Sequence, residues 1–532
     1  MMKRMFRSIV LCALLISTLG VSAQEKGLDK RIDEAFKPFS DFVTNAVFFE
    51  VFNTPFVLIL LVGSALFFTL YFGFPNVRYF GTAINVVRGK YDNLENEGHS
   101  AEKSELNIVD GDIKNTIADE SREGEVSHFQ ALATAVSGTV GNGNIAGVAL
   151  AIALGGPGAT FWMIICGLLG MSTKFVECTL GVQYRDVDEN GTVYGGPMYF
   201  LKKGLSKKGF AKLGKVVAAL FAVFCIGGSF GGGNAAQSNQ ATIVLKELLG
   251  LESAMAGTII GLSIAAVVGV IIIGGIKRIA AVTEKVVPLM ALMYILACVY
   301  IIGVNFSFVD DAISQIITEA FQPKAIGVGG VIGVLLIGFR RAAFSNEAGA
   351  GSASIAHSAV RTKYSASEGL VALLEPFIDT VVICTMTALV IVIYNMGGVF
   401  EYGGDAGVVY IDGLPYEGAG ITSKAFANYI PYSNVFLTIA VVLFAVSTMI
   451  SWSYYGLQSW KYLFGRGQAM DLTYKFLFLV FIIIGAAASM DSIWAFSDAM
   501  IFAMVFPNMV GLYFLFPEVK QQLNRYLKAI RR

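Results

Sequence analysis

The chain has 532 residues, of which 55% are hydrophobic and only 15% are charged, whereas soluble proteins carry about 25% charged residues. The 39 basic and 39 acidic side chains balance, so the composition gives no indication of a nucleic-acid surface. Together with a mean hydropathy of +0.65, these values exclude an ordinary soluble domain and predict an all-α polytopic membrane protein.

The N-terminus has a basic start, an apolar run from Ile9 to Leu19 and small residues at positions 21–23. This layout predicts a secretory signal peptide over residues 1–23, cleaved after Ala23, which places the mature N-terminus outside the cytoplasm. The alternative is a short first membrane helix, but the apolar run is shorter than the ~20 residues that span a bilayer.

Residues 24–75 are expected to hold two elements. The mixed polarity of residues 28–52 predicts an amphipathic helix at the outer interface, and residues 55–74 are apolar enough for a first transmembrane helix. The following stretch, 76–128, is long and polar. We interpret it as a solvated hairpin or a partly disordered cytoplasmic loop.

Ten further apolar runs of membrane length follow, which predicts about 11 transmembrane helices in all. Their expected ranges are 129–151, 157–183, 216–240, 254–276, 286–304, 326–356, 368–396, 431–456, 474–489 and 494–516. They form two sets of five, residues 129–304 and residues 326–516. A basic tail, 517–532, closes the chain.

Basic residues lie in alternate loops, which predicts the orientation of the chain in the membrane. The loop 184–215 contains seven of them, whereas the loops on the opposite side contain only Lys246, Lys324 and Lys424. The basic loops and the C-terminus are therefore expected on the cytoplasmic side of a bacterial inner membrane, in agreement with a cleaved signal peptide.

Two of the apolar segments are interrupted by small and polar residues: AVSGTVGNGNIAG at 135–147 and FRRAAFSNEAGAGSAS at 339–354. Lipid cannot satisfy the peptide groups that such a break exposes, and matched breaks in two halves of a transporter indicate a binding site near the bilayer midplane. Because each set has five crossings, the second set is inverted relative to the first. The alternative is that the glycines only allow close helix packing.

Several long motifs carry a family resemblance. The segments GTVGNGNIAGVALAIALGGPGATFWMIICGLLG, GGGNAAQSNQ, GFRRAAFSNEAGAGSA and FAVSTMISWSYYG resemble, in this order, the alanine or glycine:cation symporter family, over about residues 40–516. The resemblance implies a leucine-transporter-type fold in which the last ten helices form a 5+5 inverted repeat. It also implies uptake of alanine or glycine driven by sodium, with protons in some members.

The first interruption is a candidate for binding the carboxylate of a substrate. Backbone amides of Asn142, Gly143 and Asn144 lie just beyond the break, where the positive end of the following half-helix favours an anion. Glycine at position 143 allows the ligand to approach the backbone closely. The alternative role for this stretch is that of a hinge.

The resemblance adds two sets of residues. It implies a sodium site between backbone carbonyls of the first interruption and hydroxyls of the ninth segment, formed by Ser137, Val140, Ser447 and Thr448. It further implies a pocket wall for the substrate, formed by Gln237, Phe344 and Trp452. Asn234, near Gln237, is a further buried amide and a site candidate by default.

Charged residues at membrane depth must pair or face water. Arg340, Arg341, Glu347, Glu177 and Glu375 are interpreted as members of gating or structural pairs. Asp379 or Glu375 could instead bind a proton, which would change the coupling ion. His357 is expected at the cytoplasmic interface.

No Ser–His, zinc or phosphate-binding constellation is present in the sequence, so neither a cofactor nor an enzyme is expected. The sequence thus predicts a secondary transporter whose partners are a small amino acid, sodium and the lipid bilayer. A proton-coupled carrier shares the same motifs. An ion channel would need a continuous polar lining.

Overall fold

The computed structural model describes residues 28–52, 54–96, 108–109, 112–113, 124–189, 191–251, 253, 255–322, 329–404, 407–487 and 490–531. The predicted signal peptide, 1–23, lies outside these residues. In the described part, helices dominate and the strands form short hairpins.

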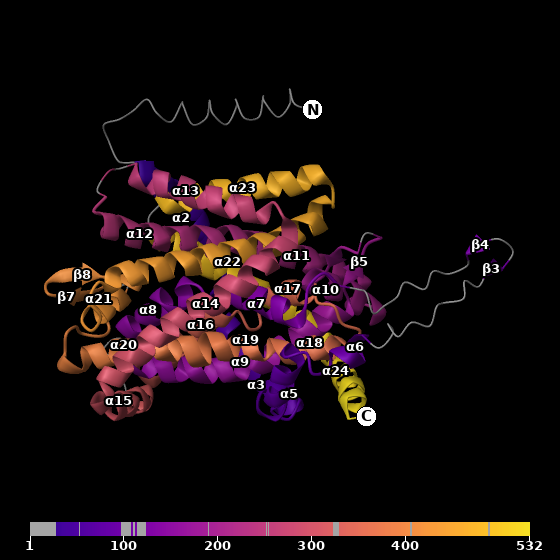
Figure 1. Ribbon diagram of the computed structural model, residues 1–532, viewed down its shortest axis with the longest axis horizontal. Helices are drawn as coiled ribbons and strands as arrows, with labels where there is room; N and C mark the ends of the chain where they lie inside the picture. The colour runs from indigo at the N-terminus through magenta and orange to yellow at the C-terminus, as the bar shows by residue number, and fades with distance from the viewer. Residues whose placement is uncertain are drawn as a thin grey trace, which may run out of the picture.

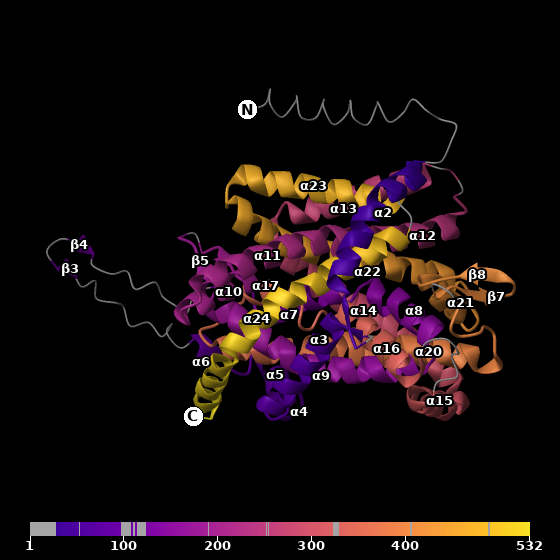
Figure 2. The same cartoon turned by 180° about the vertical axis from the view of Figure 1, so that it is seen from behind.

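The long helices run along the longest axis of the molecule, and this places the connecting elements at two ends (Figures 1 and 2). One end carries β5 (Asp186–Val187), α10 (Pro197–Lys207) and the C-terminus. This end holds the lysine-rich loop and is called the basic end below. The other end carries α15 (Val309–Phe321), α21 (Ala419–Ala427) and the hairpin of β7 (Val409–Ile411) and β8 (Leu414–Tyr416).

The predicted amphipathic helix is present as α2 (Leu28–Val47). It leads through the hairpin of β1 (Glu50–Val51) and β2 (Thr54–Pro55) into the apolar helix α3 (Phe56–Tyr71). The α2 segment packs along α24 (Met490–Ile530), as Figure 2 shows, and the rings of Phe48 and Phe502 lie 5.2 Å apart. Its position at the outer membrane interface stays a prediction.

The interpretation of 76–128 as a solvated loop needs correction for its first part. Residues 75–96 form α4 (Pro75–Arg78), α5 (Phe80–Val87) and α6 (Asp92–Asn96). Ala83 and Val86 of α5 are buried, and the ring of Phe80 lies 4.8 Å from that of Phe377. The apolar face of α5 therefore packs on the helical bundle. Further along the chain, β3 (Ile108–Val109) and β4 (Asp112–Ile113) pair as a short antiparallel hairpin.

Seven helices of the described part are long and apolar enough to cross a membrane, and one bent pair brings this number to eight. The uninterrupted ones are α9 (Gly158–Gln183), α14 (Gly275–Val304), α22 (Ser433–Phe464) and α23 (Gln468–Ala487), together with most of α24. The other two are composite: α11 (Ala211–Phe230) and α12 (Ala236–Leu249) join through the π-helix η3 (Gly231–Ala235), and α18 (Ser365–Ala372), α19 (Leu374–Pro376), η5 (Phe377–Cys384), α20 (Thr385–Tyr394) and η6 (Asn395–Gly397) form one stretch. Shorter apolar helices are α3 and α13 (Ala256–Ile272).

Each of the eleven predicted segments coincides with one of these helices or with an interrupted pair. The total of 11 and the inverted 5+5 repeat remain predictions. The predicted basic tail, 517–532, continues α24 as far as Ile530, and its cytoplasmic position stays a prediction.

Both predicted interruptions are confirmed. The first separates α7 (His128–Thr139) from α8 (Ala146–Gly155), which meet at an angle of 58° across the short 3-10 turn η2 (Asn142–Asn144). Val140 and Gly141 between them are extended. Glycine and asparagine are weak helix formers, so the local sequence favours the break.

The second interruption follows α16 (Gly330–Asn346). Glu347, Gly349 and Gly351 have φ values of 52°, 97° and 87°, the left-handed region that ends helices and favours glycine. The chain then forms the single turn α17 (Ala353–His357). The structure uses a non-glycine residue, Glu347, for the first of these left-handed positions.

Buried ion pairs join helices across the bundle. Lys174 of α9 lies 3.0 Å from Glu375 of α19, and neither side chain is exposed. Asp498 of α24 accepts hydrogen bonds from both Arg340 and Arg341, at 2.9 and 2.7 Å. The expectation of charge pairs is therefore correct for Arg340, Arg341 and Glu375. Glu347 and Glu177 instead accept hydrogen bonds from neutral side chains.

Replacing Glu375 by Gln leaves the Lys174 ammonium buried without its carboxylate. Removal of one partner of a buried pair typically costs about 3–5 kcal/mol, so Glu375→Gln should lower the unfolding temperature of the detergent-solubilised protein by many degrees. Asp310→Asn, on an exposed turn of α15, is the control and should change stability by less than about 0.5 kcal/mol. Equal unfolding temperatures for the two variants would contradict the structural role of the pair.

Candidate functional site

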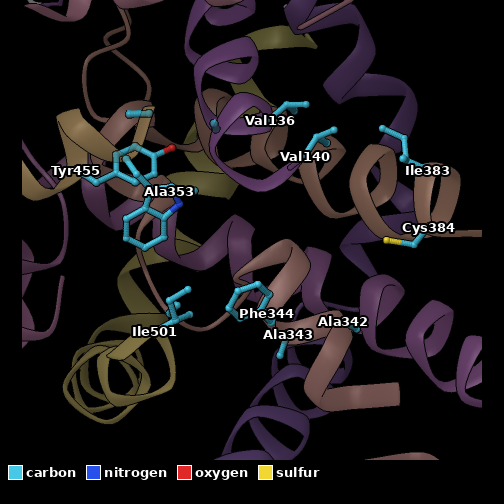
Figure 3. Close-up of a cluster of buried hydrophobic side chains, with 14 of the residues drawn as sticks. Val136, Val140, Ala342, Ala343, Phe344, Ala353, Ile383, Cys384, Tyr455 and Ile501 are labelled. Carbon is cyan, nitrogen blue, oxygen red and sulfur yellow. The ribbon is translucent and has the colours of Figure 1, made fainter. Parts of the chain in front are cut away.

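The two interruptions meet in the interior of the protein. A Cβ atom added to Gly143 would lie 3.6 Å from the Cα of Ser345 and 3.7 Å from the Cδ1 of Phe344. Figure 3 shows Val136 and Val140 of the first interrupted helix in one buried cluster with Ala343 and Phe344 of the second. The contact between the breaks, predicted from the sequence alone, is thus present.

A small cavity lies at this contact. Its lining comes from α7, η2, η3, α12, α16, α22 and α24, and consists of Gly138, Thr139, Gly143, Gly232, Gln237, Phe344, Glu347, Thr448, Trp452 and Ile501. Five of the ten predicted site residues are in this set. The free volume is about 10 Å³, close to the space that one water molecule requires, so the site is nearly closed in this conformation.

Polar partners satisfy the backbone of the first interruption. The amide of Asn142 donates to the Oε1 of Gln237 at 3.2 Å, and the amide of Gly141 donates to the Oδ1 of Asn144 at 2.8 Å. The amide of Asn144 donates to the carbonyl of Gly141 at 3.2 Å. Of the three amides predicted for a substrate carboxylate, those of Asn142 and Asn144 are therefore bonded within the protein, and Gly143 is the one that lines the cavity.

The predicted sodium ligands lie together where α7 ends against α22. The Oγ1 of Thr448 is 3.5 Å from the carbonyl oxygen of Val140, and the hydroxyl of Ser137 donates to the carbonyl of Ser447 at 2.7 Å. The hydroxyl of Ser447, however, donates to the carbonyl of Phe444 at 2.9 Å within its own helix. Of the two predicted hydroxyl ligands, only that of Thr448 faces the interruption.

The residues expected at the substrate pocket also fall into two groups, those that line the cavity and one that does not. Gln237, Phe344 and Trp452 line the cavity. The side chain of Asn234, in contrast, donates to the carbonyl of Phe478 on α23 at 2.7 Å, so this amide ties two helices together. The π-helix η3 turns Gln237 and Asn234 toward different neighbours.

A second polar cluster, which the sequence did not reveal as a unit, joins both interruptions to η5. The buried carboxylate of Asp379 accepts from the Nδ2 of Asn144 at 2.7 Å, from the Oγ of Ser345 at 2.8 Å and from the Oγ1 of Thr380 at 2.7 Å. Asp379 was recognisable as a carboxylate at membrane depth. Its partners come from distant parts of the chain, and only the fold brings them to it. Hard cations prefer such oxygen ligands.

Glu347 is the other carboxylate of the site. Its Oε1 accepts from the Nε1 of Trp452 at 3.1 Å, and its Oε2 accepts from the hydroxyl of Ser352. The side chain lines the cavity. Sequence reasoning identified Glu347 as a paired charge beyond the break but did not place it at the binding site, because its left-handed backbone turns it back toward Trp452.

A chain of paired groups closes the protein between the site and the basic end. Glu368 of α18 accepts from His128, the first residue of α7, and from His357, the last residue of α17, the latter at 2.5 Å. The Nε2 of His357 lies 3.6 Å from Glu375. The expected interfacial position of His357 was wrong, because these two carboxylates hold its ring in the interior with no exposure.

The backbone reinforces this closure. Val126, just before α7, forms a β-bridge with Val360, just after α17, and Arg185 donates to the carbonyls of Ser358 and Thr362 at 2.9 and 3.2 Å. The ends of both interrupted helices are therefore joined to each other at the basic end.

Comparison with known proteins gives the following relationships. Residues 40–532 match the model of the sodium:alanine symporter family. The sodium/alanine symporter AgcS of Methanococcus maripaludis is 38% identical over 463 residues, which cover 87% of this chain and 92% of AgcS. The probable sodium/glutamine symporter GlnT of Bacillus subtilis is 32% identical over 474 residues, which cover 89% of this chain and 88% of GlnT.

The fold has a counterpart among solved structures. The crystal structure of MhsT in complex with L-phenylalanine superposes with a TM-score of 0.51 at 15% identity, over 76% of this chain and 93% of that one. At this identity the likeness concerns the fold alone. It confirms the leucine-transporter-type fold that the sequence predicts.

Two glycines of the first interruption should respond differently to a methyl group. A Cβ atom at Gly141 would lie 2.5 Å from the Oγ1 of Thr448 and 3.2 Å from the Oε1 of Gln237, whereas one at Gly143 meets only ordinary contacts. Gly141→Ala should cost about 1–3 kcal/mol through overpacking and lower the unfolding temperature. Gly143→Ala is the matched control and should unfold near the parent temperature. A reversed order of the two variants would contradict this geometry.

Proposed function

Because this chain belongs to the sodium:alanine symporter family, we propose that it carries a small neutral amino acid, alanine or glycine, across the membrane together with sodium. The family consists of cation-coupled transporters, so the chain is not an enzyme. One relative is named as a probable glutamine symporter, and the choice of alanine or glycine therefore rests on this chain's own cavity.

The contact of the two interruptions around one closed cavity carries the proposal. An amino acid offers a carboxylate and an ammonium group, and the cavity presents the backbone at Gly143 on one side and the carboxylate of Glu347 on the other. Gly143 lies near the positive end of α8, which favours an anion. The carboxylate of Glu347, buried beside Trp452, has the charge that an ammonium requires.

Bulky side chains restrict the rest of the space. Phe344 and Trp452 line the cavity with Ile501, and Trp452 is almost completely buried. In this nearly closed conformation the cavity must widen before any amino acid can bind. The three bulky side chains would then border the side chain of the substrate and oppose large ones. Size exclusion of this kind supports alanine and glycine as substrates.

Sodium would bind where α7 ends against α22. The carbonyls of Ser137 and Val140, freed by the break, and the hydroxyl of Thr448 supply the oxygen atoms that a hard cation needs. Ser447 would contribute only after its side chain rotates away from Phe444.

Asp379 supports a second ion position, with a proton as the alternative occupant. Its carboxylate touches Asn144 and Ser345, one residue from each interruption. An ion at this point would hold both interruptions together and so link ion binding to substrate binding. A proton-coupled carrier would use the same carboxylate as its proton acceptor.

Transport then requires alternate opening of the two ends, with the basic end in the cytoplasm. In the conformation described here, the bridge at Val126 and the pairs of Glu368 with His128 and His357 close the basic end. Release of the substrate to the cytoplasm would have to separate these contacts.

Uptake into liposomes tests the proposal. Purified protein should accumulate labelled alanine when sodium is present only outside, and much less when choline replaces sodium. Unlabelled glycine should compete, whereas glutamine, leucine and phenylalanine should compete weakly. Strong competition by glutamine alone would overturn the proposed substrate.

The coupling ion is tested in the same vesicles. Uptake of alanine driven by an inward proton gradient in sodium-free buffer would show that the coupling ion is a proton and not sodium. In that case Asp379→Asn should abolish the proton-driven uptake. Flux that does not saturate with alanine concentration would indicate a channel instead of a carrier.

The two neighbouring hydroxyls of α22 provide a matched pair for the sodium site. Thr448→Ala removes an oxygen that faces Val140 and should raise the half-saturating sodium concentration roughly tenfold, the scale of one bond to a charged group. Ser447→Ala removes a hydroxyl that bonds within its own helix and should leave the sodium dependence near that of the parent. The sodium dependence of alanine uptake, measured at equal amounts of incorporated protein, distinguishes the two variants. An unchanged half-saturating sodium concentration for Thr448→Ala would show that Thr448 is not a sodium ligand.

A further inference from the structure

A second, larger cavity lies at the basic end, remote from the contact of the two interruptions. Its volume is about 540 Å³. The walls come from β5, α10, the start of α11 and the last turn of α22, and the lining residues are Asp186, Tyr199, Lys202, Lys203, Lys215, Lys461, Tyr462, Leu463, Gly465 and Arg466. Two parts of the chain that are distant in the sequence, residues 186–215 and 461–466, thus surround one space, and Figure 1 shows β5 and α10 together at this end.

The lining is strongly basic. Five cationic side chains and one carboxylate face the cavity. Lys203 and Arg466 share that carboxylate, Asp186, the latter at 3.1 Å. Lys461 bonds to Asp471, outside the lining, at 2.8 Å. Among the described residues, no carboxylate lies within ion-pair distance of Lys202 or Lys215, so an excess of positive charge remains.

Aromatic rings hold some of these cations in place. The guanidinium of Arg466 lies 3.8 Å from the ring centre of Tyr194 in β6 (Val193–Tyr194), and the ammonium of Lys202 lies 5.8 Å from that of Tyr462. Cation–π contacts of this kind restrict the side chains. The basic groups are therefore partly arranged before any ligand arrives, which distinguishes them from isolated surface lysines.

Exposed apolar side chains border the same region. On α11, Val216 directly follows Lys215 and is 58% exposed, and Leu220 is 44% exposed one turn further on. Phe464, at the end of α22, and Leu472, on α23 next to Asp471, are each more than half exposed. In a membrane helix such a surface faces acyl chains. The basic cavity therefore borders an apolar surface, the combination expected where a hydrocarbon layer meets lipid headgroups.

We propose that this cavity binds the phosphate headgroup of an anionic phospholipid, with the acyl chains lying along the exposed apolar side chains of α11 and α22. Basic pockets beside membrane helices provide the charge that such headgroups require. A free phosphate ion has the same oxyanion chemistry, but it would make no use of the apolar border. The bound lipid would join α10, α11 and α22.

Because the lipid site lies on helices that line the central cavity or lead into its walls, a bound lipid should affect transport. This effect on transport rests on the proposed function. The α22 helix carries Thr448 and Trp452, and α11 continues through η3 to Gln237. A lipid that braces α11 against α22 would stabilise two walls of the central cavity. Binding itself can be measured without any transport.

Thermal unfolding in neutral detergent, together with native mass spectrometry, tests the binding. Added phosphatidylglycerol should raise the unfolding temperature, phosphatidylcholine should not, and inorganic phosphate should not. In the double variant Lys202→Gln/Lys215→Gln, the apparent affinity for phosphatidylglycerol should fall roughly thirtyfold, from the contribution of a basic residue near a membrane surface. Asp186→Asn, which removes the only carboxylate of the lining, should retain or strengthen the effect.

A double variant at the same end of the molecule supplies the control. Lys520→Gln/Lys528→Gln removes two exposed charges from α24 and should keep the response to phosphatidylglycerol. An equal loss in both double variants would show a general charge effect and overturn the site. The absence of any stabilisation by phosphatidylglycerol would also overturn the site. Stabilisation by inorganic phosphate alone would show that the cavity binds a free anion and not a lipid.

Discussion

The need to satisfy peptide groups at membrane depth governs this structure. Lipid offers them no hydrogen-bond partners, so each interrupted helix survives only because side chains from other helices reach its backbone. Gln237 accepts from the amide of Asn142, and the hydroxyl of Thr448 lies near the carbonyl of Val140. The groups that make the break possible are the same groups that would bind substrate and ion. On the proposed function, structural support and ligand binding would therefore depend on the same groups.

The same rule applies to the charges. Asp498 binds two arginines, Glu368 binds two histidines and Glu375 binds Lys174. Each of these charges has a partner because a buried charge is costly without one. All the pairs except that of Glu368 with His357 join helices that are distant in the sequence. These pairs differ in whether they would have to separate during transport. The pairs of Glu368 connect the ends of both interrupted helices, so they lie on the proposed route to the cytoplasm, while the pair of Lys174 and Glu375 lies deeper between α9 and α19.

Glycine acts in two ways in this chain. In the first interruption it weakens the helix, and at Gly141 it also leaves room for Thr448. In the π-helix η3, a Cβ atom at Gly233 would lie only 2.2 Å from the Cγ of Trp452, so this glycine lets α22 approach closely. Close packing is thus the role of Gly233, outside both interruptions, whereas the glycines of the interruptions themselves accompany breaks in the helices.

Much of the architecture could be predicted from the sequence because it depends on local composition. Apolar runs of membrane length, the weak helix formers at 141–144, the glycines at 349 and 351, and the motifs around Gln237, Phe344 and Trp452 can all be recognised from the sequence. The tertiary structure alone decided which polar groups meet. Asn144, Ser345 and Asp379 are separated by up to 235 residues. The hydroxyls of Ser447 and Thr448 are adjacent in sequence but have different partners, Phe444 in the same helix and Val140 at the first interruption, because successive helical residues are turned by about 100°. His357 looked interfacial from its place near the end of a segment, yet the carboxylates of Glu368 on α18 and Glu375 on α19 enclose its ring. Spacing along the chain determines which segments form and where they break, whereas contacts between side chains depend on how the helices pack in three dimensions.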